Sequence, residues 1–134
     1  MWNNLNLKHF HRFNFKRLAT RNKLINEGNY GLKVLETGLI NPNELKALNF
    51  FIKKKLKKQG KFWLNLNPNF TKTKKPIETR MGKGKGNIDG LYCFVKRGQV
   101  ILEIKSISNQ LSIEILKEVK KKISLKTKIL KQVY

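Results

Sequence analysis

The chain has 134 residues, of which 30 are Lys or Arg and eight are Asp or Glu, so its formal net charge at pH 7 is +22. This length suits one domain with a modest core. So large a charge repels itself within a small fold and predicts a polyanionic partner, with nucleic acid favoured over an anionic membrane surface. The one cysteine excludes an internal disulfide and a multi-cysteine zinc site. No apolar run is long enough to span a bilayer.

Residues 1–29 are predicted to form a basic N-terminal tail in which aromatic residues alternate with cations. Such a tail suits an arm whose cations pair with phosphates and whose rings stack in RNA crevices. An amphipathic segment packed on its own domain is the alternative. Residues 1–26 contain several arginines and no acid, so a mitochondrial presequence is a further interpretation. The pair His9 and His11 has no third ligand nearby, and no metal site is expected.

Residues 30–134 are predicted to form a single α+β domain. A strand is expected over residues 30–37, followed by a helix with Asn41 as its N-cap, Pro42 at its first position and Gly60 as its C-terminal glycine. Its predicted buried face consists of Leu45, Leu48, Ile52 and Leu56. Its opposite face, predicted to contact RNA, carries Lys46, Lys53, Lys54, Lys57 and Lys58. A short strand over residues 62–66 should turn Trp63 away from Phe62 and Leu64.

A long Gly/Lys loop is predicted over residues 67–87. Three of the nine glycines fall within residues 82–86, with a lysine between each pair, and six cations accompany a single acid over residues 71–86. Glycine lets the backbone adopt positive φ and approach a partner closely, so the loop is expected to meet phosphates. The predicted RNA-binding residues are Lys74, Lys75, Arg80, Met81, Gly82, Lys83, Gly84, Lys85 and Gly86 in the loop, with Arg12, Arg17 and Arg21 in the tail.

After the loop, two apolar runs over residues 91–95 and 100–104 flank a glycine-containing turn, which predicts a β-hairpin. A second helix is expected over residues 109–122, with Ser108 as its cap and a last strand within residues 125–133. The face turned to the sheet should consist of Leu111, Ile115, Val119 and Ile123. The predicted fold is therefore a mostly antiparallel sheet with two helices packed on it.

The sequence shows no catalytic arrangement. The eight carboxylates are scattered singly, and no nucleophile motif accompanies them. Residues 82–87 share glycines and lysine with phosphate-binding loops of nucleotide hydrolases, but they lack the required spacing and the hydroxyl that binds magnesium. Cys93 lies in an apolar strand and is expected to be buried and unreactive. We therefore expect no enzyme, no cofactor and no metal.

The motif KPIETRMGKGKG at residues 75–86 closely resembles the signature of the bacterial-type large-subunit ribosomal protein sixteen family. The resemblance extends over residues 30–130, including YGLK from Tyr30 and QGKFW from Gln59. It implies a structural protein that binds large-subunit rRNA near the peptidyl-transferase centre and helps to position aminoacyl-site tRNA. By the same likeness, Arg80 would make a bidentate contact with phosphate or base, and Lys83 and Lys85 would act as mobile point charges.

The chain departs from the family pattern at several positions. Gly90 and Leu91 stand where the family tends to have aromatics, Gln99 where a basic residue is usual and Ser124 where proline is common. The family's glycine-rich tail is replaced before residue 28 by an aromatic, asparagine-rich stretch, so contacts of that tail are not carried over. This divergence, the lack of an obvious cleaved leader and a composition typical of an AT-rich genome suggest a mitochondrial ribosome in the matrix and an organelle-encoded gene.

Expected partners are large-subunit rRNA, aminoacyl-site tRNA and neighbouring ribosomal proteins, without a membrane and without a homo-oligomer. Two alternatives stay open. An RNA-modifying or nucleotide-using RNA factor would show turnover of RNA or nucleotide. A basic protein bound to a membrane surface would need helices whose apolar faces are left exposed.

Overall fold

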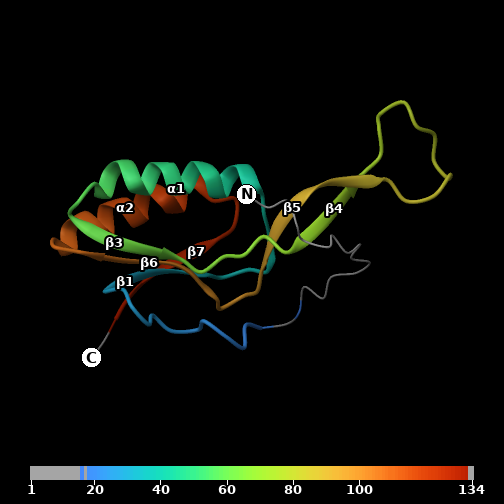
Figure 1. Ribbon diagram of the computed structural model, residues 1–134. Helices are drawn as coiled ribbons and strands as arrows, with labels where there is room; N and C mark the ends of the chain where they lie inside the picture. Colours follow the sequence, from blue (N-terminus) through green and yellow to red (C-terminus); the bar gives the residue numbers. More distant parts are fainter. Residues whose placement is uncertain (1–15, 17, 133–134) are drawn as a thin grey trace.

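The computed structural model describes residue 16 and residues 18–132, which form an α+β fold of antiparallel sheets and two helices (Figure 1). The helices are α1 (Pro42–Leu56) and α2 (Asn109–Lys122). The strands are β1 (Tyr30–Val34), β2 (Gly38–Ile40), β3 (Gly60–Leu64), β4 (Phe70–Lys74), β5 (Asn87–Val95), β6 (Val100–Ser106) and β7 (Thr127–Lys131). The predicted fold class is confirmed, although the strands form two sheets rather than one.

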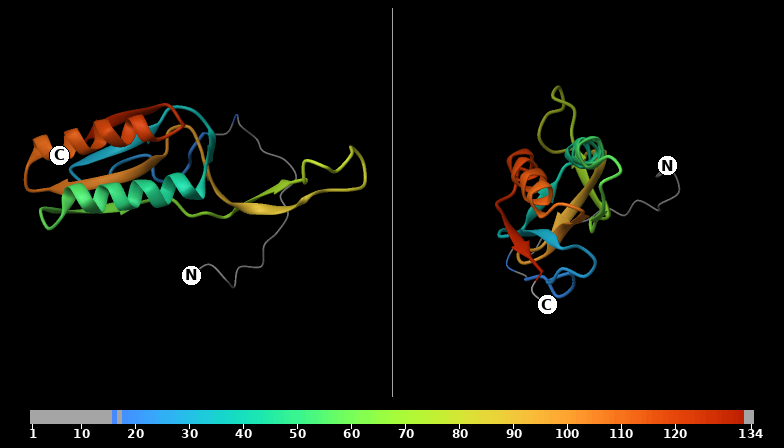
Figure 2. Two further views of the ribbon diagram at one scale, coloured as in Figure 1. Left: turned by 90° about the horizontal axis from the view of Figure 1, so that it is seen from above. Right: turned by 90° about the vertical axis from the view of Figure 1, so that its left-hand side faces the viewer.

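The larger sheet has the strand order β3-β6-β1-β7, and both helices pack on one of its faces (Figures 1 and 2). Leu32, Leu102, Ile52 and Ile115 are at most 1 % exposed, so the core lies between this sheet and the helices. Phe62 and Leu64 pack against the same core. Burial of these aliphatic side chains is the main source of stability.

Helix α1 begins as the sequence predicts. The Asn41 side-chain oxygen accepts a hydrogen bond from the Asn43 amide at 3.0 Å, and the predicted face of Leu45, Leu48, Ile52 and Leu56 is buried. The predicted end at Gly60 is wrong. The helix stops at Leu56, Lys57 takes a positive φ of 47°, and Gly60 opens β3. A Cβ at Gly60 would collide with the Lys105 carbonyl oxygen on β6, so glycine permits close strand approach there.

Helix α2 also begins where predicted, with Ser108 at the N-cap position. The Ser108 side chain makes no capping hydrogen bond; instead, the Ser106 hydroxyl donates to the Ser108 carbonyl oxygen at 2.6 Å. Ile115, Val119 and Ile123 are buried as expected, and Leu111 packs against the core. Two further residues, Leu116 and Ser112, are buried as well.

The hairpin predicted between residues 91–95 and 100–104 is wrong. The turn itself forms, because the Gln99 amide donates to the Lys96 carbonyl at 3.1 Å and Gly98 has a φ of 89°. The flanking strands nevertheless separate: β5 pairs with β2 and β4 in the smaller sheet, whereas β6 pairs with β1 and β3. Residues 96–99 therefore form a corner at which the chain passes from one sheet to the other.

The observed hairpin is β4 with β5, and residues 75–86 form the loop at its tip (Figure 1). The predicted loop 67–87 is too long, because residues 70–74 near its start form strand β4 and Asn87 at its end opens β5. Phe70 and Thr71 are buried at the base of this hairpin, while Lys72 and Lys74 are exposed. The Gly/Lys segment thus starts from paired strands.

A buried carboxylate joins residues 18–29 to the sheet. Glu103, on β6 and 1 % exposed, accepts hydrogen bonds from the backbone amides of residues 26, 27 and 28 at 3.0, 2.8 and 3.1 Å. Its other oxygen accepts from the Asn65 side chain at 2.8 Å. Three successive amides pointing at one oxygen form an anion-binding nest. Gly28 is needed here, because a Cβ would lie 2.9 Å from the Ile104 amide nitrogen.

Replacing Glu103 by Gln should lower the free energy of unfolding by about 3 kcal/mol, because an amide offers one acceptor oxygen and turns a donor toward other donors. Chemical unfolding followed by circular dichroism measures this loss. The same change at the exposed Glu114 is the matched control and should be nearly neutral. Equal stability of the two variants would contradict the role assigned to Glu103.

Candidate nucleic-acid interface

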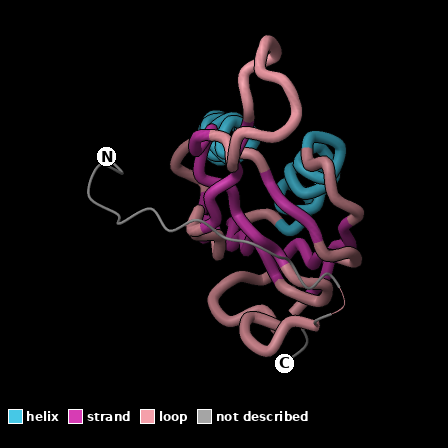
Figure 3. The backbone as a smooth tube through the Cα atoms, turned by 90° about the vertical axis from the view of Figure 1, so that its right-hand side faces the viewer, coloured by secondary structure: helices cyan, strands magenta, loops and turns pink. Residues whose placement is uncertain are grey.

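The loop of residues 75–86 stands clear of the body of the molecule. It lies beyond the end of the β4–β5 hairpin, and from the hairpin side it rises above the level of the two helices (Figures 1 and 3). Ile77 and Met81 are 97 % and 101 % exposed, so even its apolar side chains project into solvent. The loop is therefore free to enter a partner.

Glycines determine the backbone of the loop. Gly82, Lys83 and Gly84 have φ values of 94°, 50° and 81°, so three consecutive residues adopt the left-handed region. Lysine rarely adopts it, and the flanking glycines reduce the cost. Apart from the glycine itself and its chain neighbours, no atom of residues 16 and 18–132 lies within 4 Å of where a Cβ would stand at Gly82 or Gly84. The Lys75 ammonium donates to the Gly82 carbonyl and closes the loop across its width.

The structure brings most of the predicted site residues together. Lys74 is the last residue of β4, and Lys75, Arg80, Met81, Gly82, Lys83, Gly84, Lys85 and Gly86 follow in the loop. Arg21 is exposed but lies elsewhere, because its neighbours Ala19 and Asn22 bond to Arg97 and Val100 beside the 96–99 corner. Arg12 and Arg17 lie outside the described residues.

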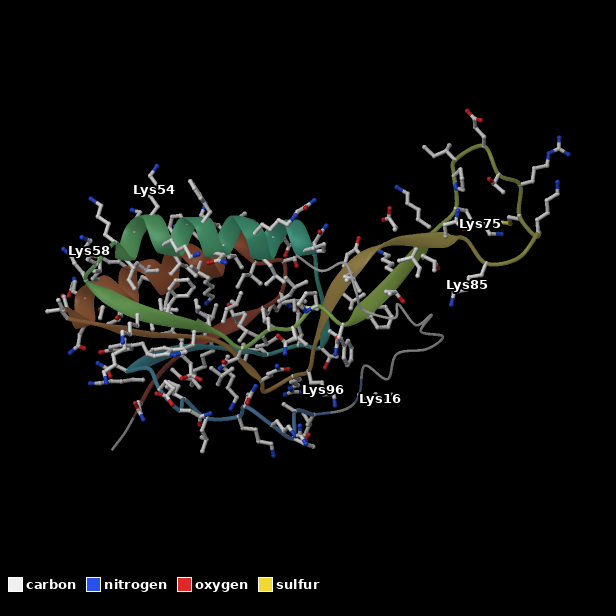
Figure 4. The ribbon with its side chains drawn as sticks, in the orientation of Figure 1. Lys16, Lys54, Lys58, Lys75, Lys85 and Lys96 are labelled. Atoms are coloured by element: carbon white, nitrogen blue, oxygen red, sulfur yellow. The ribbon has the colours of Figure 1, made fainter. Side chains whose placement is uncertain are left out.

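Cations also surround the body. Lys54 and Lys58 lie at the end farthest from the loop, and Lys16 and Lys96 lie on the side of the sheet opposite the helices (Figure 4). The lysines predicted on the outer face of α1 are all exposed. Several carboxylates are already engaged inside the chain: Glu103 and Glu36 accept backbone amides, and Glu118 pairs with Lys55 at 3.3 Å. The excess positive charge therefore needs an external partner.

A basic hollow that sequence reasoning missed lies at the far end of the larger sheet. Lys58, Lys61 and Lys105 line a cavity of about 350 Å³ together with the 87 %-exposed Ile107. Pairing of Lys61 with Lys105 across β3 and β6 brings two of these cations together. Only strand register reveals this cluster, because Lys105 lies more than 40 residues from Lys58 and Lys61 in the sequence.

Three lysine–aromatic contacts were also missed. The Lys72 ammonium lies 5.4 Å from the centre of the Tyr92 ring on the hairpin. The Phe51 ring lies between Lys55 of α1 and Lys122 of α2, at 5.9 and 4.9 Å. Such cation–π contacts hold lysine stems against apolar surface. They order the cations before a partner binds.

Comparison with known proteins decides the family. Residues 5–130 match the family Ribosomal protein L16p/L10e. The chain belongs to this family. It is 39 % identical over 122 residues to the large ribosomal subunit protein uL16 of Thermosipho melanesiensis, covering 91 % of this chain and 86 % of the relative. The uL16 proteins of Fervidobacterium nodosum and Ureaplasma parvum are 40 % and 36 % identical, over 89 % and 91 % of this chain and 84 % and 88 % of the relatives.

The match to the L16p/L10e family confirms the resemblance found in the loop motif. It begins at residue 5, so it reaches further toward the N-terminus than the expected start at residue 30. As a member of this family, the chain is a structural ribosomal protein and not an enzyme. The relatives named above are bacterial.

The described part of the chain offers little for other chemistry. It contains no group of three His, Cys, Asp or Glu residues that could hold a metal ion, and His9 and His11 lie outside it. Neither α1 nor α2 is long and apolar enough to cross a membrane. Their apolar faces, which binding to a membrane surface would need to expose, are buried in the core.

Cys93 is buried in β5 as predicted, and burial raises the pKa of its thiol from 9.0 to about 11. The reactive thiolate is therefore about a hundredfold scarcer at pH 8 than in an exposed cysteine. Alkylation by iodoacetamide at pH 8 should be at least that much slower in the folded protein than in urea, as measured by mass spectrometry. Equal rates in the two conditions would show that the thiol is accessible.

Proposed function

We propose that this chain is a structural constituent of the large ribosomal subunit that binds large-subunit rRNA near the peptidyl-transferase centre. Membership of the L16p/L10e family supports this proposal. The cations distributed over opposite ends of the molecule support it as well, because a folded RNA presents phosphates on several sides. Neighbouring ribosomal proteins complete the set of proposed partners.

Within this function, the loop of residues 75–86 helps to position aminoacyl-site tRNA. The observation that carries this proposal is a cationic loop, exposed at residues 76–85, that two paired strands hold away from the body. Arg80 supplies a planar guanidinium for a bidentate contact with phosphate or base. Lys83 and Lys85 add point charges, and the glycines between them let the backbone come close to the RNA.

The double variant Lys83→Ala and Lys85→Ala tests both parts of the proposal. Affinity of the full-length chain for an rRNA fragment should fall steeply with salt, and the variant should lower the slope of log K against log salt by about 1.4 to 1.8 if both lysines contact phosphates. Filter binding over a series of salt concentrations measures this. A flat salt dependence of the wild-type chain would contradict rRNA binding.

A charge-matched control separates tRNA positioning from general attraction. Lys117→Ala with Lys121→Ala removes the same charge from exposed positions on α2. In reconstituted subunits, occupancy of the aminoacyl site by tRNA should fall in the loop variant and stay near wild type in the α2 variant. Equal occupancy in the two variants would refute the role of the loop and leave rRNA binding intact.

We further propose that the ribosome in question is mitochondrial, in the matrix, and that the gene lies in the organelle. The support is compositional: Asn, Lys and Ile are abundant, whereas alanine occurs only at Ala19 and Ala47. The bacterial relatives add no support for this location.

Fractionation of cells by compartment tests the location. Peptides of this chain should sediment with large subunits from mitochondria, and ribonuclease should release the chain as free protein because RNA is the tether. Mass spectrometry of gradient fractions makes the measurement. Recovery only with ribosomes of another compartment would overturn the mitochondrial proposal, and sedimentation unchanged by ribonuclease would argue against RNA as the tether.

A further inference from the structure

A cavity of about 350 Å³ lies where the first turn of α1 meets the β4–β5 hairpin. Pro42, Lys46 and Pro68 line it together with residues 88–91 of β5. The cavity has the size of small-ligand sites, which start at about 300 Å³. The loop of residues 75–86 is not part of its lining.

A β-bulge gives the cavity its acidic residue. On β5, Gly90 is paired with Lys72 and Ile88 with Thr73, so Asp89 is an extra residue without a partner on β4. A regular strand turns consecutive side chains to opposite faces, yet four consecutive residues of β5 border this cavity. The bulge explains the exception, because bulges bend a strand and change the direction of side chains.

Gly90 leaves one wall of the cavity without a side chain. A Cβ at this position would meet only the Tyr92 ring, at 3.7 Å, and the glycine has no positive φ that would demand it. A larger residue is therefore compatible with the backbone here. The open space depends on the absence of a side chain rather than on backbone strain.

The lining combines apolar surface with one cation and one carboxylate. Pro42, Pro68 and Leu91 present flat or aliphatic surface, and Lys46 and Asp89 are both exposed at the rim. The Glu103 carboxylate accepts four hydrogen bonds within the chain. The Asp89 carboxylate accepts none from the residues that the structure describes, so both of its oxygens can accept from a ligand. In a chain of charge +22, a carboxylate facing RNA repels phosphate. It can favour RNA binding by accepting hydrogen bonds from a ribose 2′-hydroxyl or from a base, and only a base offers two adjacent donors that match its two oxygens.

We propose that this cavity takes one unstacked guanine base of RNA, an inference that rests on the proposed rRNA binding. The base lies against the prolines and Leu91. Its N1–H and N2–H donors, side by side on the Watson–Crick edge, bond to the two oxygens of Asp89. Lys46 contacts the adjoining phosphate. Uracil, with one donor between two acceptors, fits this carboxylate poorly.

An RNA hairpin with a single unpaired nucleotide tests the proposal, with guanine, uracil or an abasic site at that position. Fluorescence anisotropy of the labelled RNA with the full-length chain should give roughly tenfold tighter binding for guanine. Asp89→Asn should abolish the preference by weakening guanine binding. Electrostatics alone predicts the opposite change, because this variant raises the net charge by one and would tighten binding to every RNA.

Two further variants complete the experiment. Glu78→Gln makes the same charge change on the exposed loop and should keep the preference for guanine. Gly90→Phe fills the cavity and should abolish the preference without affecting circular dichroism. Equal affinity of the wild-type chain for the three RNAs would overturn the cavity proposal while leaving RNA binding intact. Failure to bind any of them would overturn the proposed function itself.

Discussion

One buried carboxylate attaches the segment before β1 to the larger sheet. Glu103 lies in the middle of β6, which is a central strand of the larger sheet, and its neighbours in register are Gly31 and Trp63. Gly31 has no side chain, and a Cβ there would lie 2.9 Å from Ile25 Cγ1, so the glycine leaves room for the segment whose amides at residues 26–28 bond to the carboxylate. Those bonds fix the segment before β1 against the face of the sheet that the helices leave uncovered. A buried charge is tolerated there because four donors satisfy it.

The remaining charge of the molecule has the opposite sign and lies outside. Eight acids cannot neutralise thirty cations. Two of these acids, Glu103 and Glu36, accept hydrogen bonds from backbone amides instead of pairing with a lysine or arginine. Repulsion among surface lysines opposes the compact state. An RNA partner relieves it, and mass action then adds the free energy of binding to stability. Folding and assembly are therefore coupled for a protein of this composition.

Local patterns predicted the helices well and the strand pairing poorly. The N-cap at Asn41 and the buried faces of α1 and α2 follow from spacing within one segment, and the structure confirms them. The hairpin between residues 91–95 and 100–104 was wrong because β1 and β2, distant in sequence, take the edges of these strands. The role of Glu103 involves amides 75 to 77 residues away. The sequence did contain one indication that Glu103 is buried, because it is the single acid in the apolar run VILEI at residues 100–104.

The structure places the loop residues together because they are contiguous, and recognising a contiguous motif needs no knowledge of the fold. The hollow lined by Lys58, Lys61 and Lys105 and the bulge at Asp89 could not be predicted in this way. Both arise from register between strands. Strand register is decided by packing over the whole sheet, so it cannot be predicted from a short stretch of sequence.

The corner at residues 96–99 also determines how the loop is carried. The chain also passes from the larger to the smaller sheet between β1, which pairs with β6, and β2, which pairs with β5. Two hydrogen bonds join this crossing to the corner: the Gly98 amide donates to the Val34 carbonyl, and the Arg97 amide donates to the Thr37 hydroxyl. Among the described residues of the smaller sheet, β2 is the one strand that pairs with the hairpin, over three residues. The hairpin is thus held to its sheet at its base, over a short stretch, while its loop lies far from that attachment. A rotation of a few degrees about the base would therefore displace residues 75–86 much further than it displaces the base itself.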